Sequence, residues 1–257
     1  MPEPPSIYDH VVLIVMENRA YDQIIGSSDA PYLNKLAGQA GLATNFFAEA
    51  HPSLPNYIAM TSGSTHGITD DNPPTDHPLS VSSIFSLLPG GGSRSLEESM
   101  PANCGQADSG NYAVRHNPQA YYTNLGGDCA HYNVPLADPP DLSARFTFVT
   151  PNLINDMHDG TVADGDTWLS TFVPKLLASA EYAAGRTALF ITWDEDDDLS
   201  GNHIPTFVIA PSVAPGTRVS ATLNHYSMLR ATQQMLNVAP LLGSAATAAD
   251  MRTQFNL

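Results

Sequence analysis

Three runs of apolar residues along the chain each end abruptly in polar side chains. The runs occupy residues 10–16, 145–150 and 187–193, and their short length and β-branched and aromatic content predict buried strands. The polar residues that follow the first run are Glu17 and Asn18, and those that follow the third are Asp194 to Asp198. After the second run come Asn152, Asn155, Asp156, His158 and Asp159. In open α/β sheets, ligands bind at the carboxyl ends of the strands. We therefore expect three segments that are distant in sequence to meet at one edge of a sheet.

Between these strands the hydrophobic spacing changes to that of helices. Helices are expected at 30–40, 57–60, 81–88, 164–183 and 225–236. Two further apolar runs, 42–47 and 206–210, predict additional strands. Strands that alternate with helices indicate an α/β fold in which a mainly parallel β-sheet is sandwiched by helices. No convincing linker interrupts the chain, so residues 1–257 are expected to form a single domain.

The segment 89–141 has little regular periodicity and many Gly, Asn and Tyr residues. A connection of this length is uncommon in a compact domain unless it is functional, so we expect a loop-rich cap over the strand ends. Both cysteines, Cys104 and Cys129, lie in this segment. Their placement within one long loop favours a disulfide and an oxidising compartment, and the alternative is two unrelated buried thiols.

Charge and composition exclude several classes of protein. Ten basic residues against 26 acidic ones give a net charge of −16, which repels nucleic acid and anionic membranes. No apolar stretch approaches the roughly 20 residues that cross a bilayer, so integral membrane association is not expected. The segment 1–5 lacks the basic start and apolar core of a signal peptide. We expect a monomer that is secreted or periplasmic, with any signal peptide absent from this sequence.

The acidic run after the third strand is hard to explain by packing alone. Carboxylates this close repel one another, and a cation at the strand end would remove the cost of burying them. A solvated acidic loop is the alternative, and it is the interpretation that we favour for Asp196 to Asp198. The candidate ligands and reactive groups along the chain are Glu17, Asn18, Ser53, Asp156, His158, Asp194, Glu195 and His203. These oxygen and imidazole groups suit one or two divalent cations of the Ca²⁺, Mg²⁺, Mn²⁺ or Zn²⁺ type.

Ser53 lies at a predicted junction between a strand and a helix. The segment 51–56 leads into the helix around 57–60, and Pro55 fits the first turn of that helix. A serine there is close to free backbone N–H groups, and a neighbouring cation would make its hydroxyl a usable nucleophile. The GxSxG pattern of a nucleophile elbow is absent, which disfavours Ser-His-Asp hydrolysis. A structural alternative is that Ser53 only caps the helix.

Five segments together resemble one known family. They are Met16-Glu-Asn-Arg-Ala-Tyr-Asp22, His51-Pro-Ser-Leu-Pro-Asn-Tyr57, Arg115-His-Asn-Pro118, Pro151-Asn-Leu-Ile-Asn-Asp-Met-His-Asp159 and Trp193-Asp-Glu195. In this order they resemble the bacterial phosphoesterase family of the alkaline phosphatase superfamily, which contains acid phosphatases and phospholipases C. The resemblance covers most of the chain, and it implies an alkaline phosphatase-like fold.

The resemblance also implies roles for individual residues. The catalytic metal would be bound by Glu17, Asn18, Asp194 and Glu195, with Ser53 as the nucleophile that also touches it. His116, His158 and His203 would contact phosphate or act as acids, and His158 or His203 could hold a second cation beside Asp156. His51 is expected to be a partner of the site or a turn residue. A substrate-binding asparagine of the nucleotide pyrophosphatase branch corresponds to Asn72, although Asp71 fits as well.

The sequence therefore predicts a metal-dependent phosphoesterase. The favoured activity is that of a phosphomonoesterase of acid phosphatase type, which works through a phosphoserine intermediate on a small phosphoester. A phosphodiesterase of phospholipase C type, acting on a phospholipid head group, is the alternative; the chain is much shorter than the larger phospholipases C. An alternative from another class is a non-catalytic calcium-binding protein.

Overall fold

A nine-stranded sheet forms the centre of the computed structural model, which describes residues 1–257. Its strands are β1 (His10–Met16), β2 (Gly41–Phe47), β3 (Ser93–Glu97), β4 (Asn133–Pro135), β5 (Phe146–Thr150), β6 (Thr187–Trp193), β7 (His203–Ile209), β8 (Arg218–Val219) and β9 (Leu223–Asn224). They lie in the order β4-β3-β5-β1-β6-β7-β2-β8, and β9 also pairs with β2. Only β7 runs antiparallel to its neighbours. The predicted mainly parallel sheet is confirmed.

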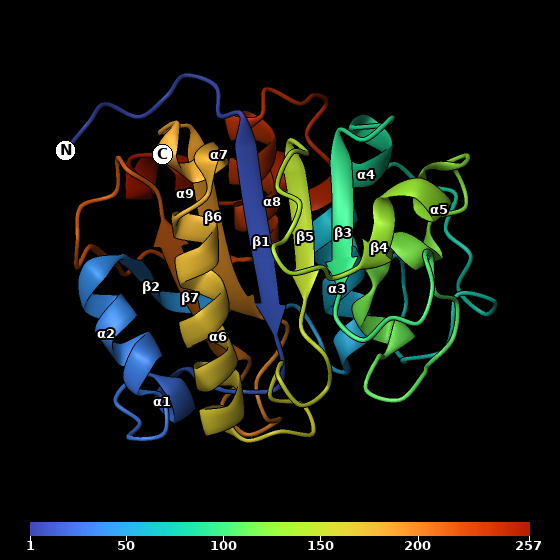
Figure 1. Ribbon diagram of the computed structural model, residues 1–257, viewed down its shortest axis with the longest axis horizontal. Helices are drawn as coiled ribbons and strands as arrows, with labels where there is room; N and C mark the ends of the chain where they lie inside the picture. The colour runs from blue at the N-terminus through green and yellow to red at the C-terminus, as the bar shows by residue number, and fades with distance from the viewer.

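Helices cover both faces of this sheet (Figure 1). They are α1 (Tyr21–Ile24), α2 (Pro31–Gln39), α3 (Ser53–Ser62), α4 (Ile84–Leu87), α5 (Asp128–Tyr132), α6 (Val162–Leu177), α7 (Ala180–Ala183), α8 (His225–Met235) and α9 (Met251–Phe255), with 3₁₀ turns η1 (Val114–His116), η2 (Pro118–Tyr121) and η3 (Gly243–Ala246). The pair α2 and α6 packs on one face, and α3 packs with α8 on the other. The α/β sandwich expected from the sequence is therefore present.

The central strands are buried along their whole length because helices lie above and below them. In β1 and β6 every residue except His10 is buried. Strands covered on both faces are apolar throughout instead of alternating, which is why these two runs were visible in the sequence. Their paired ends, Met16 and Trp193, lie side by side, so the residues that follow them start from adjacent positions.

Three predicted helices differ clearly in their bounds, and the one expected at 81–88 is the short helix α4, Ile84–Leu87. The expected helix at 164–183 is two helices, because Ser179 accepts a hydrogen bond from Tyr182 N and starts α7. The helix predicted around 57–60 begins earlier, at Ser53, and Pro55 lies in its first turn as expected. The earlier start places Ser53 at the amino end of a ten-residue helix.

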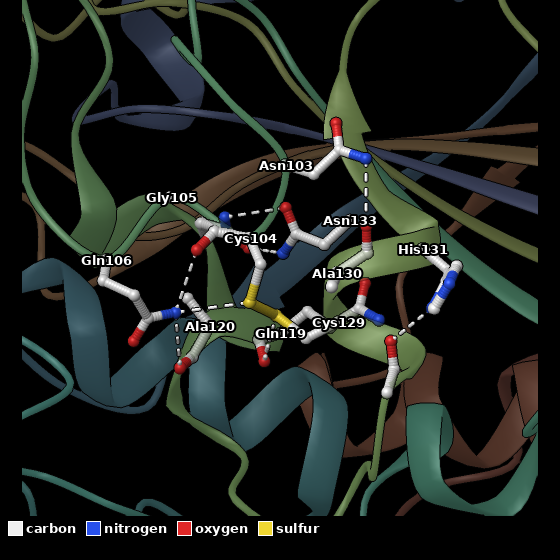
Figure 2. The surroundings of a disulfide bond; sticks show 12 residues. Asn103, Cys104, Gly105, Gln106, Gln119, Ala120, Cys129, Ala130, His131 and Asn133 are labelled. Carbon is white, nitrogen blue, oxygen red and sulfur yellow. Dashed lines mark hydrogen bonds between the residues drawn. A yellow bond between two sulfur atoms is a disulfide. The ribbon is translucent and has the colours of Figure 1, made fainter.

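The segment 89–141 contains more regular structure than the sequence suggested. Its two ends form β3 and β4 at one side of the main sheet, and only its middle crosses toward the strand ends. The strand β3 was hidden because its sequence, SRSLE, is mostly polar although four of its five residues are buried. The predicted disulfide between Cys104 and Cys129 is formed and ties this middle part to α5 (Figure 2).

The two chain ends lie near each other, on the side of the sheet where β1 begins (Figure 1). The Arg252 guanidinium joins them, since it donates to the main-chain oxygens of Pro5 and Ser6. None of the helices combines the length and apolar character needed to span a membrane.

Candidate active site

A cluster of carboxylates forms where β1 and β6 end. Glu17 follows β1 directly, and Asp194 and Glu195 follow β6. The main-chain bond from Asp194 N to Met16 O continues the pairing of the two strands past their ends. All three acidic side chains are buried, so the structure brings together the acidic residues predicted after the first and third strands.

Ser53 points into this cluster from the amino end of α3. Its Oγ donates to Glu17 Oε2 at 3.1 Å and lies 3.4 Å from Glu195 Oε1. Asn56 holds the turn before the helix, because its side chain accepts from Glu49 N and Ala50 N at 3.0 Å each. The hydroxyl therefore contacts two carboxylates that follow two different strands, β1 and β6.

Asn18 extends the same cluster. Its main-chain N–H donates to Asp194 Oδ1 at 3.2 Å, and its φ of +53° is a left-handed conformation that asparagine tolerates well. Asn18 Oδ1 and Asp194 Oδ2 are buried and have no hydrogen-bond partner. Two oxygens without partners in a buried acidic cluster are ligands of the kind that hard divalent cations take.

Burial and mutual repulsion perturb the acidity of the cluster. Burial, followed by the charges of Asp194 and Asp156, raises the pKa of Glu17 well above its usual value. Burial also raises the pKa of Asp194 to about 7 and, with the Asp194 charge, that of Glu195 to about 10. A cation among these groups would hold them ionised. The donor set of Glu17, Asn18, Ser53, Asp194 and Glu195 therefore fits a bound divalent cation.

Imidazoles form the other side of the site. His116, which ends η1, is buried, and its Nε2 lies 3.4 Å from Glu17 Oε1. His158 lies in the loop between β5 and α6, and its ring centroid is 5.5 Å from that of His116. One ligand atom each from Glu17, His116 and His158 lie within 4.8 Å of one another. These three residues could hold a cation, and burial lowers the pKa of His116, which favours the neutral ring that metals need.

Asp156 contacts the residues of this imidazole side. Its Oδ2 lies 3.3 Å from His116 Nδ1, and its Oδ1 accepts from His158 N at 2.7 Å. Its main-chain oxygen accepts from Glu17 N at 2.8 Å. Burial raises the pKa of Asp156 to about 8. Asp156 thus links both imidazoles to the residue that begins the carboxylate cluster.

His203 is not brought into the site. It begins β7, its Nε2 lies 3.0 Å from the Thr44 main-chain oxygen, and its ring stacks on Tyr21. The histidine on that side of the carboxylates is His225 of α8, whose Nε2 lies 2.8 Å from the Asp194 main-chain oxygen. His225 therefore supports the main chain of the carboxylate cluster.

His51 contacts the site, but Asp196 differs from its expected state. His51 Nδ1 lies 2.9 Å from Glu195 Oε2, and Nε2 lies 3.1 Å from Asp196 Oδ1. Asp196 is buried, and its Oδ2 accepts from the main-chain N–H groups of Ser200 and Asn202. The prediction that Asp196 is solvated was wrong, because the turn after β6 needs an acceptor for its own backbone donors.

The structure separates the two candidates for a phosphate-binding residue. The Asn72 side chain is exposed, whereas Asp71 Oδ1 accepts from Leu54 N at 2.9 Å, in the first turn of α3. Asp71 is therefore the residue of the pair that lies against the serine's helix.

Two residues near the imidazoles were missed by the sequence analysis. Tyr57 OH donates to Glu17 Oε1 at 2.5 Å, and its position four residues after Ser53 on one helix was the available signal. Arg115 Nη2 lies 3.2 Å from His158 Nε2, and it directly precedes His116 in a quoted motif. Arg115 is a half-buried cationic side chain at the outer side of the imidazoles.

Comparison with known proteins agrees with this geometry. A profile described as "Phosphoesterase family" matches residues 26–239, most of the chain. The chain belongs to the phosphoesterase family. A phosphatidylinositol-3-phosphatase from Mycobacterium tuberculosis is 36% identical over 249 residues, which cover 94% of this chain and 81% of that protein.

More distant phosphoesterase relatives are longer. A phosphate-repressible acid phosphatase from Penicillium chrysogenum is 27% identical over 253 residues, covering 86% of this chain and 57% of that protein. This chain thus spans little more than half of that relative. A solved structure of an alkaline phosphatase superfamily protein from Vibrio parahaemolyticus has a TM-score of 0.65 and 14% identity, and the match covers 97% of this chain and 72% of that one. The fold is that of the alkaline phosphatase superfamily.

The family membership decides between the classes of function considered above. This phosphoesterase is an enzyme that hydrolyses phosphoric esters. A non-catalytic calcium-binding protein, the alternative from another class, does not agree with the phosphatase relatives.

Proposed function

We propose that the protein is a metal-dependent phosphomonoesterase in which Ser53 is the nucleophile. The observation that carries this proposal is the position of Ser53 Oγ, 3.1 Å from Glu17 and 3.4 Å from Glu195 at the amino end of α3. The structural alternative, in which Ser53 only caps its helix, does not explain this position, since the Ser53 hydroxyl makes no capping bond.

The metal would be held by Glu17, Asn18, Ser53, Asp194 and Glu195. When bound, it supplies positive charge that lowers the pKa of the Ser53 hydroxyl and offsets the charge of the phosphoryl group. Three of the proposed ligands, Glu17, Asp194 and Glu195, have raised pKa values. Two oxygens of the proposed ligand set, Asn18 Oδ1 and Asp194 Oδ2, have no hydrogen-bond partner. A second cation could lie between Glu17, His116 and His158, and His158 would then be a ligand instead of a proton donor.

Residues of the carboxylate side and of the imidazole side would take different parts in the reaction. Ser53 Oγ forms a bond to phosphorus as the bond from phosphorus to the alcohol oxygen breaks, which leaves a phosphoserine. The Ser53 proton passes to a neighbouring carboxylate, and His158 at the outer side can supply a proton to the leaving alcohol. Water then attacks phosphorus as its bond to Ser53 Oγ breaks; His158 takes a proton from the water, the carboxylate returns its proton to Ser53 Oγ, and phosphate is released. Arg115, beside His158, is placed to contact phosphate oxygens.

We infer that the substrate is a small phosphomonoester or a phosphorylated lipid head group. The support is the 36% identity to a protein named phosphatidylinositol-3-phosphatase. The disulfide supports a secreted or periplasmic location, since such bonds persist in oxidising compartments. We propose that the protein acts as a monomer.

The nucleophile is tested with Ser53→Ala and, as a matched control, Ser62→Ala at the other end of the same buried helix. Turnover of p-nitrophenyl phosphate is expected to fall by more than about 10³-fold in the first variant and to persist in the second. Rapid acid quench with mass spectrometry should detect one phosphoryl group on the peptide that contains Ser53 in the wild type.

A fully active Ser53→Ala protein would contradict the nucleophile assignment. A substrate panel then sharpens the activity: p-nitrophenyl phosphate, phosphatidylinositol 3-phosphate in vesicles and bis-p-nitrophenyl phosphate. Turnover of the diester above both monoesters would indicate a phosphodiesterase instead.

A further inference from the structure

Glu98 is a half-buried carboxylate directly after β3, outside the catalytic cluster. Its Oε2 accepts from Asn152 N at 2.9 Å, and the Asn155 amide donates to both of its oxygens at 2.9 and 3.0 Å. Trp168 Nε1 of α6 donates to Oε1 at 3.2 Å. One carboxylate therefore joins β3 and α6 to the loop that follows β5.

This loop delivers two residues of the imidazole side. Asp156 follows Asn155 directly, and Asp156 N donates to Asn152 O at 2.8 Å. Asp156 in turn accepts from His158 N through its side chain and from Glu17 N through its main chain. The two residues that Glu98 holds are thus the ones that flank or support Asp156.

The loop is held by packing and by individual hydrogen bonds, among them Leu153 N to Asn111 O and Arg19 Nη2 to Gly160 O. Residues 151–161 form no helix or strand, so sheet or helix hydrogen bonding does not set their position. Met157 is fully buried with φ at +83°, and a Cβ added to Gly160 would lie 2.0 Å from the Ile154 oxygen. The loop is therefore tightly packed in one conformation, and a shift at Asn155 would pass directly to Asp156.

We propose that Glu98 is a positioning residue for the active site, which acts by fixing the loop that carries Asp156 and His158. This inference rests on the proposed function of those two residues. A carboxylate suits the task because an ionised side chain accepts from several N–H donors at once. Residues that hold metal ligands in place from outside typically contribute about 10- to 100-fold in metal affinity or activity.

The test is Glu98→Gln. Glutamine keeps one acceptor oxygen but turns an NH₂ group toward the N–H donors of Asn152 or Asn155, so at least one of these bonds is lost. The outer side of Glu98 borders a cavity of about 190 Å³ that Trp168 also lines, so a glutamine side chain can be accommodated there without disrupting the fold. We expect kcat to fall about 10- to 100-fold. Affinity for Mn²⁺, titrated calorimetrically into chelator-treated protein well below its Tm, should weaken as well.

Two control variants separate positioning from general stability. Trp168→Phe removes the bond from α6 and part of the stacking on Phe172, so it is expected to lower the Tm while kcat and Mn²⁺ affinity stay as in the wild type. Glu97→Gln makes the same chemical change on the neighbouring residue, a buried carboxyl with an oxygen that has no partner, and should also leave kcat unchanged. Asn155→Ala removes the amide that donates to Glu98 and should reproduce the losses of kcat and Mn²⁺ affinity expected for Glu98→Gln.

Wild-type kcat and Mn²⁺ affinity in Glu98→Gln, or in Asn155→Ala should the first variant fail to fold, would overturn the positioning role. That outcome leaves the proposed function intact as long as Ser53→Ala is inactive. An active Ser53→Ala protein would remove the proposed function whatever the Glu98 variants do.

Discussion

The two sides of the site are built on different parts of the fold. The carboxylates Glu17, Asp194 and Glu195 directly follow β1 and β6, the two fully buried central strands. The imidazoles come from elsewhere: His116 from a 3₁₀ turn between β3 and β4, and His158 from an irregular loop. The first set is fixed by the register of the sheet, and the second by local hydrogen bonds.

Those local bonds are concentrated around the imidazole side. Thr150 Oγ1 donates to the His116 main-chain oxygen, and the buried amides of Asn117 and Asn133 bond each other. The disulfide lies beside them, because Cys104 N donates to Asn133 O (Figure 2). On the carboxylate side the backbone continues the strands, and Tyr57 and His225 add bonds to Glu17 and to the Asp194 main-chain oxygen. The carboxylates that we propose to bind the cation thus extend from the rigid core, while the imidazoles lie on segments that can vary more readily.

The largest effect is expected from a change on the strand-borne side. Asp194→Asn keeps the shape of the side chain but removes the charge that a divalent cation would meet. We expect bound metal to be lost and turnover to fall by more than about 10³-fold, measured by metal analysis and p-nitrophenyl phosphate hydrolysis. Asp198→Asn, in the exposed part of the same acidic run, is the control and should behave as the wild type. Metal retained at full occupancy in Asp194→Asn would contradict the proposed ligand set.

A smaller effect is expected from the loop-borne side. His158→Asn removes a group that can supply a proton to the leaving alcohol, which is worth about 10²-fold in kcat. His131→Asn, on the exposed surface of α5, serves as the control. The loss should shrink with substrates whose leaving groups are more acidic, since these need less protonation. A loss of turnover as large as that of Asp194→Asn, together with lost metal, would place His158 among the essential ligands. The proposed division between strand-borne ligands and a loop-borne proton donor would then be wrong.

The smallest effect concerns stability and its dependence on pH. Burial raises the pKa of Asp194 to about 7 and of Asp156 to about 8, against about 4 for a carboxyl in the unfolded chain. These two carboxyls therefore bind more protons in the folded metal-free protein than in the unfolded chain, so their contribution to stability falls as pH rises from about 4 to about 8. Burial lowers the pKa values of His116 and His225, which opposes this trend below about pH 6.5, so the net fall is expected between about pH 6.5 and 8. Calorimetry in a chelator should show a falling Tm over this range, and added Mn²⁺ should restore it most at the upper end. A Tm that rises with pH in the chelator would contradict buried, cation-dependent carboxyls.

The same contrast explains how far the sequence could be interpreted. Glu17 and Asp194 were predictable because uninterrupted apolar runs mark strands covered on both faces. His203 was expected at the site from the family resemblance, but its ring packs on Tyr21, which no spacing indicates. Asp196 was misjudged because its partners are backbone N–H groups of a turn, which carry no sequence signal.

The same limit applies to the supports of the imidazoles. The strand β3 alternates too weakly to be recognised, so Glu98 could not be placed beside Asn152 and Asn155 before the topology was known. The disulfide was predictable in itself, since two cysteines share one long segment, but the part of the site that it supports was not.

The position of the two chain ends has a practical consequence. Both leave the fold where β1 begins, across the sheet from the carboxylates that follow its last residue (Figure 1). A tether, fusion partner or solid support attached at either end would therefore lie at the edge of the sheet opposite Glu17 and Asp194. Bulky esters presented on a vesicle could still approach an immobilised enzyme from its free side.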